Sequence, residues 1–376
     1  MKKKIVILSL TLGFGGIEKY ISSLCNMFQN DFDIEIICNY KETNKPAFNF
    51  YNAKIKYLIN ECYSNVSIKK LIKEVKILDL IKEIIKRIKF KYNEKNLMIK
   101  ELKKIDCNYI ITTRIKHNKL VNKYVKKKGI IKIATEHNFY DIEPKYDIKL
   151  VNSVKNFDYF ILVSKELREH YLQFMDSKKC IYIPNVIDYI SNSKSCLPGK
   201  NIISVGRFSP EKGFLDLIEV MKKVVKLDKE VKLFLIGDGY QKDIIKYKIN
   251  EYGLNENIIL TGYKNPNEQE QYYLKSSLYV MTSLSESFGI VLLESMNYGV
   301  PCIAFSSAKG AKKILNDVNF PIIEDRNTDN MAKLIVKLLN DKDELFKMQN
   351  NGKIYIKKYS LLNIKKMWDE IINVDD

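Results

Sequence analysis

The stretch NIISVGRFSPEKGF, residues 201–214, contains the structural unit from which this chain is built. Its first six residues are mainly apolar and end at Gly206, which is typical of a buried strand. Serine, proline and glycine follow, and these residues favour a turn before a helical pattern begins at Phe214. A strand that passes through a tight turn into a helix is the repeating unit of parallel α/β sheets.

The same alternation of short apolar runs and amphipathic stretches occurs throughout the chain. Runs of this kind indicate parallel strands covered on both faces, and two series of them indicate two doubly wound domains. The first series comprises residues 4–10, 33–38, 109–113, 131–136, 159–164 and 180–184; the second comprises residues 201–206, 232–237, 257–262, 277–283 and 301–305.

The length of 376 residues also favours two domains, because a single core rarely grows that large. The break falls in residues 186–200, VIDYISNSKSCLPGK, which have linker composition and no periodicity. We therefore predict domains over residues 1–185 and 186–358. Residues 359–376 contain the single tryptophan, Trp368, and read as an amphipathic helix that packs back on the first domain.

The net charge of +18 is concentrated in the first domain. Up to Asn185 there are 36 lysines and arginines against 20 acidic residues, which favours an anionic partner such as a nucleic acid, a membrane surface or a phosphorylated substrate. Residues 67–91 combine an apolar helical stripe with nine basic and three acidic residues. Such a helix either lies on an anionic membrane or packs on the sheet with a solvated lysine face.

The seven cysteines are scattered without a Cys-x-x-Cys pair, which argues against a zinc site or a disulfide framework and favours a reducing cytoplasm. The N-terminal sequence has a basic start and a short apolar run. Because it lacks a small-x-small cleavage site, we interpret it as a first strand. No segment reaches the roughly 18 uninterrupted apolar residues of a spanning helix.

Arg207 and Lys212 follow the first strand of the second domain. Ligands of open α/β sheets bind outside the carboxyl ends of the strands, and two cations there suit a diphosphate. Gly206 and Gly213 let the backbone bend closely around such a ligand. The pair is explained less well as two unrelated surface cations.

The matching position of the first domain holds GFGGIEKY, residues 13–20. Gly13, Gly15 and Gly16 allow close approach of another molecule, and free N–H groups at a helix start favour an anion. Glu18 occupies the sixth position of the dinucleotide fingerprint G-x-G-x-x-G, where glycine or alanine is expected. The interpretation as a dinucleotide-binding loop is therefore weak. His137 directly follows a later strand and is either a site residue or a structural histidine that caps the strand.

Two further patterns carry less weight. Residues 31–33, DFD, match a metal-diphosphate signature, but they precede a strand and so lie at the end of the sheet away from ligands. Residues 237–239, GDG, end a strand and are most simply a turn.

Taken together, the motifs resemble the retaining glycosyltransferases of family 4, over roughly residues 5–315. These motifs are GGIEKY, EHN, VSKELREHY, IPNVID, SVGRFSPEKGF, IGDG, TGY and SLSESFGIVLLESMNYGVP. The resemblance implies the GT-B fold, an α/β fold of two facing Rossmann-like domains with parallel sheets and an interdomain cleft.

The resemblance implies a role for each matching residue. Arg207 and Lys212 would hold the donor diphosphate, Glu286 the hydroxyls of the transferred sugar, and Glu294 the ribose. His137 would lie beside the reacting sugar, and with Arg207, Lys212 and Glu286 it forms the expected catalytic set. The remaining expected donor-binding residues are Gly15, Gly16, Gly206, Gly262, Tyr263, Ser287, Phe288, Gly289 and Ile290.

Glu286 and Glu294 are eight positions apart, which in a helix gives ~12 Å of rise and leaves them ~80° apart around the axis. They are therefore unsuited to act as an acid–base pair on one bond, and the spacing suits a clamp on an extended donor. One stretch departs from the family pattern: Gly310 is retained, but Ala311 replaces a common proline and Lys313 lies about where an acid is usual.

The sequence thus predicts a retaining, metal-independent glycosyltransferase without a cofactor. It would move a hexose or N-acetylhexosamine from a nucleotide-diphosphate sugar, with UDP-sugar favoured, to a glycan or lipid-linked acceptor in bacterial-type cell-surface polysaccharide or glycoconjugate synthesis. We expect a cytoplasmic protein, peripheral on the inner membrane face through its basic first domain and residues 67–91, that does not bind nucleic acid. The alternatives are a non-hydrolysing nucleotide-sugar epimerase of the same fold and a basic nucleic-acid-binding protein.

Overall fold

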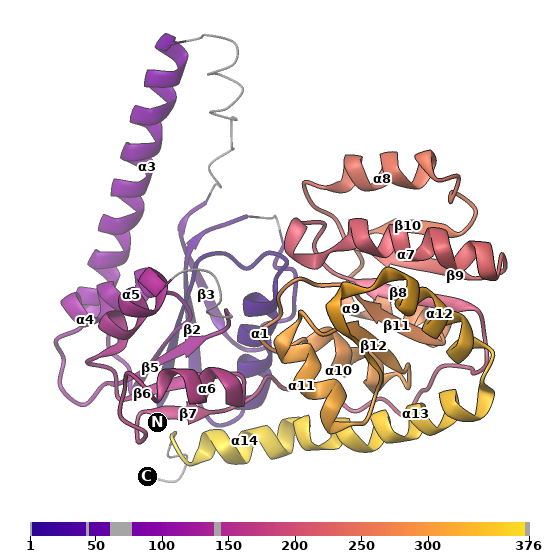
Figure 1. Cartoon of the computed structure of the whole chain (residues 1–376). Helices are drawn as coiled ribbons and strands as arrows, with labels where there is room; N and C mark the ends of the chain where they lie inside the picture. The colour runs from indigo at the N-terminus through magenta and orange to yellow at the C-terminus, as the bar shows by residue number, and fades with distance from the viewer. Residues whose placement is uncertain (1, 43–44, 61–76, 139–143, 373–376) are drawn as a thin grey trace.

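The first half of the chain forms a seven-stranded parallel sheet in the order β3-β2-β1-β4-β5-β6-β7 (Figure 1). The computed structural model describes residues 2–42, 45–60, 77–138 and 144–372. The strands are β1 (Lys4–Ser9), β2 (Asp33–Tyr40), β3 (Lys54–Ile59), β4 (Tyr109–Thr112), β5 (Ile131–Glu136), β6 (Tyr159–Leu162) and β7 (Cys180–Tyr182). The helices between them are α1 (Gly16–Phe28), α3 (Ile77–Lys104), α4 (Ile115–Tyr124), α5 (Pro144–Val154) and α6 (Lys165–Tyr171).

The second half forms a six-stranded parallel sheet in the order β10-β9-β8-β11-β12-β13. Its strands are β8 (Asn201–Val205), β9 (Lys232–Ile236), β10 (Ile258–Gly262), β11 (Leu278–Met281), β12 (Cys302–Phe305) and β13 (Ile322–Ile323). Its α-helices are α7 (Phe214–Leu227), α8 (Lys242–Glu251), α9 (Pro266–Leu274), α10 (Ile290–Asn297), α11 (Lys309–Asp317), α12 (Thr328–Leu339), α13 (Lys342–Tyr355) and α14 (Leu361–Asp369), with short 3-10 turns η1 (Pro210–Lys212), η2 (Glu324–Arg326) and η3 (Ile356–Tyr359).

All eleven predicted strands are present, which confirms the expected pair of parallel sheets. Alternate residues of β1 show why the runs are apolar throughout: Ile5 and Ile7 join one core, whereas Val6 and Leu8 join the other. The sequence prediction missed β3 and β13. Both are edge strands, and β3 alternates lysines with half-buried residues, so neither has the continuous apolar run of a central strand.

The C-terminal helix α14 packs on the first sheet, although it follows the second domain (Figure 1). Trp368 is fully buried there and its ring contacts Phe28 of α1 edge to face, with 6.0 Å between the ring centroids. Lys365 also pairs with Asp31 at 3.1 Å, so the DFD stretch faces this helix. The chain therefore crosses between the domains after β7 and again before α14.

Each sheet has one point at which its strand order reverses, between β1 and β4 in the first sheet and between β8 and β11 in the second. Ligands of doubly wound sheets bind beyond the carboxyl ends of strands at such switch points. The predicted Gly15 loop follows β1, the Arg207 loop follows β8, and the Glu286 loop follows β11. The fold thus brings the predicted motifs to the two switch points.

Candidate active site

The loop that carries Arg207 is fixed by the turn after the neighbouring strand β9. The N–H of Phe208 donates to the carbonyl oxygen of Asp238 at 2.9 Å. Gly237 has a φ of +152°, and a Cβ there would lie 1.9 Å from the carbonyl oxygen of Gly206. The GDG stretch is therefore a packing turn in contact with the Arg207 loop, and it needs glycine for that reason.

Lys212 and Glu286 form an ion pair, although 74 positions separate them in the sequence. Lys212 ends η1, and Glu286 lies in the loop between β11 and α10. The carboxylate of Glu286 also accepts a hydrogen bond from the hydroxyl of Ser283 at 3.1 Å. Gly213 permits this approach, because a Cβ at its φ of +63° would lie 2.1 Å from the carbonyl oxygen of Thr282.

Arg326, which the sequence interpretation missed, ties the loops of this site together. One terminal nitrogen donates to the carbonyl oxygen of Ser283 at 3.2 Å and to the hydroxyl of Ser307 at 2.7 Å. The other donates to the carbonyl oxygen of Thr282 at 2.9 Å and pairs with Asp216 of α7. The guanidinium therefore joins the ends of β11 and β12 to the helix that follows Lys212.

The loop before α10 is held by the start of α11. Gly289, with a φ of +84°, lies directly before Ile290, the first residue of α10. The N–H of Gly310 donates to the carbonyl oxygen of Glu286 at 2.9 Å, and a Cβ on Gly310 would lie 2.5 Å from that of Ser287. Gly310, the glycine that is kept where the sequence departs from the family pattern, thus packs directly on the predicted sugar-binding loop.

The glycine loop of the first domain meets the Arg207 loop of the second. Arg207 donates to the carbonyl oxygen of Phe14 at 3.3 Å. The ring of Phe14 lies on that of Tyr263, which follows β10, with 3.7 Å between the centroids. Gly15 is close as well, since a Cβ there would lie 3.6 Å from an Arg207 nitrogen, whereas Gly16 and Gly262 have open space around a Cβ position.

Glu294 has the first domain's Lys19 as its cationic neighbour, not Lys212. Lys19 of α1 pairs with Asp188 at 3.1 Å, and the same ammonium acts electrostatically on Glu294. Burial raises the pKa of Glu294, with Lys19 opposing and Asp188 adding to that shift. Burial acts to lower the pKa of Lys19, but Asp188 and Glu294 raise it overall. The two predicted glutamates therefore have different cationic neighbours.

His137 lies at the end of β5 against α1. Its Nε2 is 3.0 Å from the hydroxyl of Thr135, and its ring contacts Tyr20 edge to face. Burial and the charge of Arg114 lower the pKa of His137 to about 3, so the ring is neutral near pH 7. Burial raises the pKa of the neighbouring Glu136 to about 7, although it accepts hydrogen bonds from the backbone N–H groups of residues 137 and 138.

The switch point of the first sheet holds buried polar atoms that have no hydrogen-bond partner within the described ranges. These atoms are the hydroxyl of Thr113 and Nε of Arg114, directly after β4; Oδ1 of Asp188, in the segment after β7, also has no partner there. Arg114 also lies 3.8 Å from Glu18. Unpartnered buried polar groups are costly, so these atoms are candidates for contact with a ligand. Neither Arg114 nor Asp188 was singled out from the sequence.

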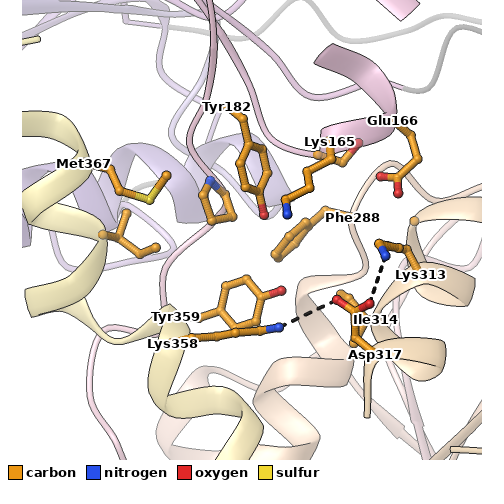
Figure 2. A pocket seen from close by; sticks show the side chains of 14 residues that line it. Lys165, Glu166, Tyr182, Phe288, Lys313, Ile314, Asp317, Lys358, Tyr359 and Met367 are labelled. Atoms are coloured by element: carbon orange, nitrogen blue, oxygen red, sulfur yellow. Dashed lines mark ion pairs between the residues drawn. The ribbon is translucent and has the colours of Figure 1, made fainter. Parts of the chain in front are cut away.

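A cavity of about 210 Å³ lies between the domains beside the C-terminal crossing (Figure 2). Its walls come from the start of α6, the end of β7, α11, η3 and α14. Figure 2 shows Lys313 and Lys358 reaching Asp317, at 2.9 and 3.6 Å. Of the predicted site residues only Phe288 lines this cavity. Lys313 therefore pairs within α11, beside the interdomain crossing, rather than with the Lys212–Glu286 pair.

The described part of the chain contains no cluster of three or more histidine, cysteine or acidic side chains suited to a metal. Within those same residues, no helix combines the length and apolar character needed to cross a bilayer. Of the predicted stripe in residues 67–91, the positions Ile68, Leu71, Ile72 and Val75 lie outside the described residues, and the later positions belong to α3.

Comparison with known proteins finds one matching family model and several relatives. Residues 192–355 match the family model of glycosyl transferases group 1. The chain is 28% identical over 261 residues to the poly(ribitol-phosphate) alpha-N-acetylglucosaminyltransferase of Staphylococcus aureus, covering 67% of this chain and 52% of that protein. It is 25% identical over 381 residues to the N-acetylgalactosamine-N,N'-diacetylbacillosaminyl-diphospho-undecaprenol 4-alpha-N-acetylgalactosaminyltransferase of Campylobacter jejuni, covering 97% of this chain and 98% of that protein.

Solved structures share the whole fold. A mutant of S. aureus TarM in complex with fondaparinux, alpha-GlcNAc-glycerol and UDP superposes with a TM-score of 0.78 at 17% identity, over 99% of this chain and 100% of that one. Anabaena Alr3699/HepE in complex with UDP and glucose gives a TM-score of 0.72 at 16% identity, over 98% and 99%. The expected GT-B fold is thereby confirmed. The chain therefore has the two-domain GT-B fold, and residues 192–355 match the glycosyl transferases group 1.

Proposed function

We propose that this protein is a retaining glycosyltransferase that moves a hexose or N-acetylhexosamine from a UDP-sugar to a glycan or lipid-linked acceptor. The observation that carries the proposal is the convergence of Arg207, Lys212 and Glu286 beyond the switch point of the second sheet. The glycine loop of the first domain lies against the same arginine. A diphosphate between two cations and a sugar beside a carboxylate would match this arrangement.

In the proposed reaction, the bond between the anomeric carbon and the β-phosphate oxygen breaks while the acceptor oxygen bonds to that carbon on the same face. The acceptor proton passes to the departing phosphate oxygen, so neither a carboxylate nucleophile nor a metal is needed. Arg207 and Lys212 would stabilise the charge that grows on the leaving diphosphate. Glu286 would accept hydrogen bonds from sugar hydroxyls and so fix the sugar for attack.

The nucleotide end of the donor would lie at Glu294. Its carboxylate would accept hydrogen bonds from the ribose hydroxyls, and the Lys19 ammonium would oppose the rise in its pKa that burial causes. A neutral His137, with its low pKa, would act beside the sugar as a hydrogen-bonding group and not as a cation. These assignments extend the donor along the loop and helix from Glu286 to Glu294.

The class of substrate comes from the relatives. Both curated relatives are named as transferases of N-acetylhexosamines in alpha linkage, and one acts on a diphospho-undecaprenol acceptor. Alpha products made from alpha-linked nucleotide sugars correspond to retention. We extend this class to the present chain, in bacterial cell-surface polysaccharide or glycoconjugate synthesis at the cytoplasmic side of a membrane. No cofactor beyond the donor enters the proposal.

The test begins with thermal unfolding of the purified chain in the presence of uridine, guanosine and adenosine diphosphate sugars. A true donor raises the midpoint with concentration, because it binds only the folded state. The selected donor is then supplied with lipid-linked and soluble glycan acceptors, and NMR reports the anomeric configuration of the product. An inverted product would contradict retention, and epimerisation of the donor without acceptor would favour the epimerase alternative.

Variants test the site itself. Arg207→Ala and Glu286→Gln should each lower kcat/KM by about 100-fold, as expected for loss of a group that stabilises charge or position. Glu230→Gln is the matched control, because Glu230 is an exposed carboxylate whose ion pair with Lys200 lies at 2.7 Å on the surface. Wild-type kcat/KM in either site variant would show that the residue assignment is wrong.

A further inference from the structure

Helix α3 is anchored to the first domain mainly by its C-terminal half. Glu94 is 3% exposed and pairs with Lys116 of α4, and Met98 and Leu102 are buried in the core. Asn39, at the end of β2, bonds to the same Glu94. From this base the N-terminal half extends beyond the rest of the domain (Figure 1). The first turns are therefore a projection held by a buried polar network.

The projecting half exposes a row of large apolar side chains. Leu78 is 74% exposed, Ile88 62% and Tyr92 67%, and Ile81 and Ile85 are each nearly half exposed. Successive members are three or four residues apart, so they form one stripe along the helix. Exposure on this scale argues against the second sequence interpretation, because a helix packed on the sheet would have buried these side chains.

The opposite side of α3 faces the protein. Glu94 is buried, and the ring of Phe90 contacts Tyr40 of β2 with 6.2 Å between the centroids. At 100° per residue these positions lie across the helix from the apolar stripe. The stripe therefore points away from the domain. The acidic residues in the N-terminal half of α3, Asp79 and Glu83, do not lie on the stripe.

Exposed lysines border the stripe on both sides. Lys82 and Lys89 lie along one edge, and Lys91 lies along the other. Apolar side chains flanked by cations match the interface of an anionic bilayer, where the apolar side chains enter the acyl boundary and the lysines contact lipid headgroups. A second copy of the helix would instead bring rows of like charge together, which disfavours self-association.

We propose that residues 78–92 of α3 dock on the surface of an anionic lipid bilayer. The helix lies with the stripe in the headgroup region, and the anchored C-terminal half holds the domain at a fixed position relative to that surface. This docking goes beyond the proposed sugar transfer and does not depend on it. It supplies a physical reason for the first domain's excess of positive charge.

Vesicle flotation tests the docking with the full-length protein at low ionic strength. Vesicles contain phosphatidylcholine alone or phosphatidylcholine with phosphatidylglycerol. Binding to the anionic vesicles should exceed that to the neutral ones. The double variant Ile81→Asn/Ile88→Asn should weaken it by about tenfold or more, as should Lys82→Glu/Lys89→Glu, since burial and charge both contribute. Higher salt should weaken the wild type in the same direction.

The matched control is Leu227→Asn/Ile354→Asn, which removes two apolar side chains of comparable exposure from the second domain. It should bind vesicles like the wild type. All variants should keep the wild-type thermal midpoint, because the altered side chains are exposed.

Three outcomes would overturn the proposal: full binding by both α3 variants, vesicle binding that the control loses equally, or a stripe-dependent dimer without vesicle binding. Preference for a single-stranded RNA over the vesicles would overturn it as well. Transfer to a water-soluble acceptor separates this proposal from the proposed function. The α3 variants should retain this transfer activity. If the proposed function is wrong, the wild type should lack the activity as well.

Discussion

Gly310→Ala should displace the proposed sugar-binding loop without removing any side chain of the candidate site. Gly310 is the second residue of α11, and a Cβ built there lies 2.5 Å from the carbonyl carbon and oxygen of Ser287 and 2.6 Å from the nitrogen of Phe288. Because ordinary contacts begin at 3.4 Å, α11 and the loop must separate by about 0.9 Å. Backbone atoms form the obstacle, so a side-chain rotation cannot relieve it.

The displacement acts directly on Glu286, whose carbonyl oxygen accepts the N–H of Gly310 at 2.9 Å. A misplacement of about 1 Å at a reacting sugar costs about 100-fold in rate, so kcat/KM for sugar transfer should fall by about that factor. Overpacking of this kind should also lower the free energy of unfolding by about 1–3 kcal/mol. Gly310 has no positive φ, so an alanine suits the helix itself and the clash alone causes the loss.

The matched control is Gly253→Ala, because Gly253 has a φ of +66° and nothing within 4 Å of a Cβ. It should cost about 1–2 kcal/mol of stability through left-handed backbone strain and leave kcat/KM unchanged. Steady-state transfer at a temperature where both variants are folded, together with urea unfolding, separates the two effects. Equal kcat/KM in Gly310→Ala and Gly253→Ala would refute the argument.

Three further predictions concern residues outside the motifs. Burial lowers the pKa of His117 from 6.5 to about 3, so its contribution to stability is present above pH 6.5 and is lost as the pH falls. Between pH 7 and 5, urea unfolding should show the free energy of unfolding falling by about 2 kcal/mol less in His117→Gln than in the wild type. An equal fall in both proteins would contradict this. Arg326→Ala should lower kcat by about 10- to 100-fold, with partial recovery in added guanidinium, and a rate that guanidinium leaves unaffected would argue against positioning. Lys19→Met removes the cation that opposes the raised pKa of Glu294, so the acidic limb of the kcat/KM profile should move to higher pH; an unshifted limb would exclude this coupling.

Periodicity was enough to predict the parallel sheets, because a strand buried on both faces must be apolar at every position. The same rule explains why β3 was missed. Its lysines, such as Lys54 and Lys56, alternate with half-buried residues at the edge of the first sheet. No continuous run marks such a strand, and only the neighbouring β2 supplies the backbone partners that define it.

The candidate site was predictable only as far as its motifs. Glycines and cations directly after strands locate the Arg207 and Glu286 loops, since the topology of the sheet fixes which loops meet. Arg326 gives no such signal, because it follows the two-residue strand β13 and reaches its partners through a left-handed turn. Lys19 lies within a recognised motif, but its pairing with Asp188 depends on how the two domains meet.

The different neighbours of the two glutamates bear on how a donor would be sensed. Glu286 and its partner Lys212 both belong to the second domain, so their pairing does not depend on the position of the first. Glu294 is balanced by Lys19, which the first domain carries. Separation of the domains would therefore remove the cation from Glu294 and leave the Lys212–Glu286 pair intact. In the proposed function, the sugar end of the clamp is then preformed, whereas the ribose end becomes complete only when the domains lie together.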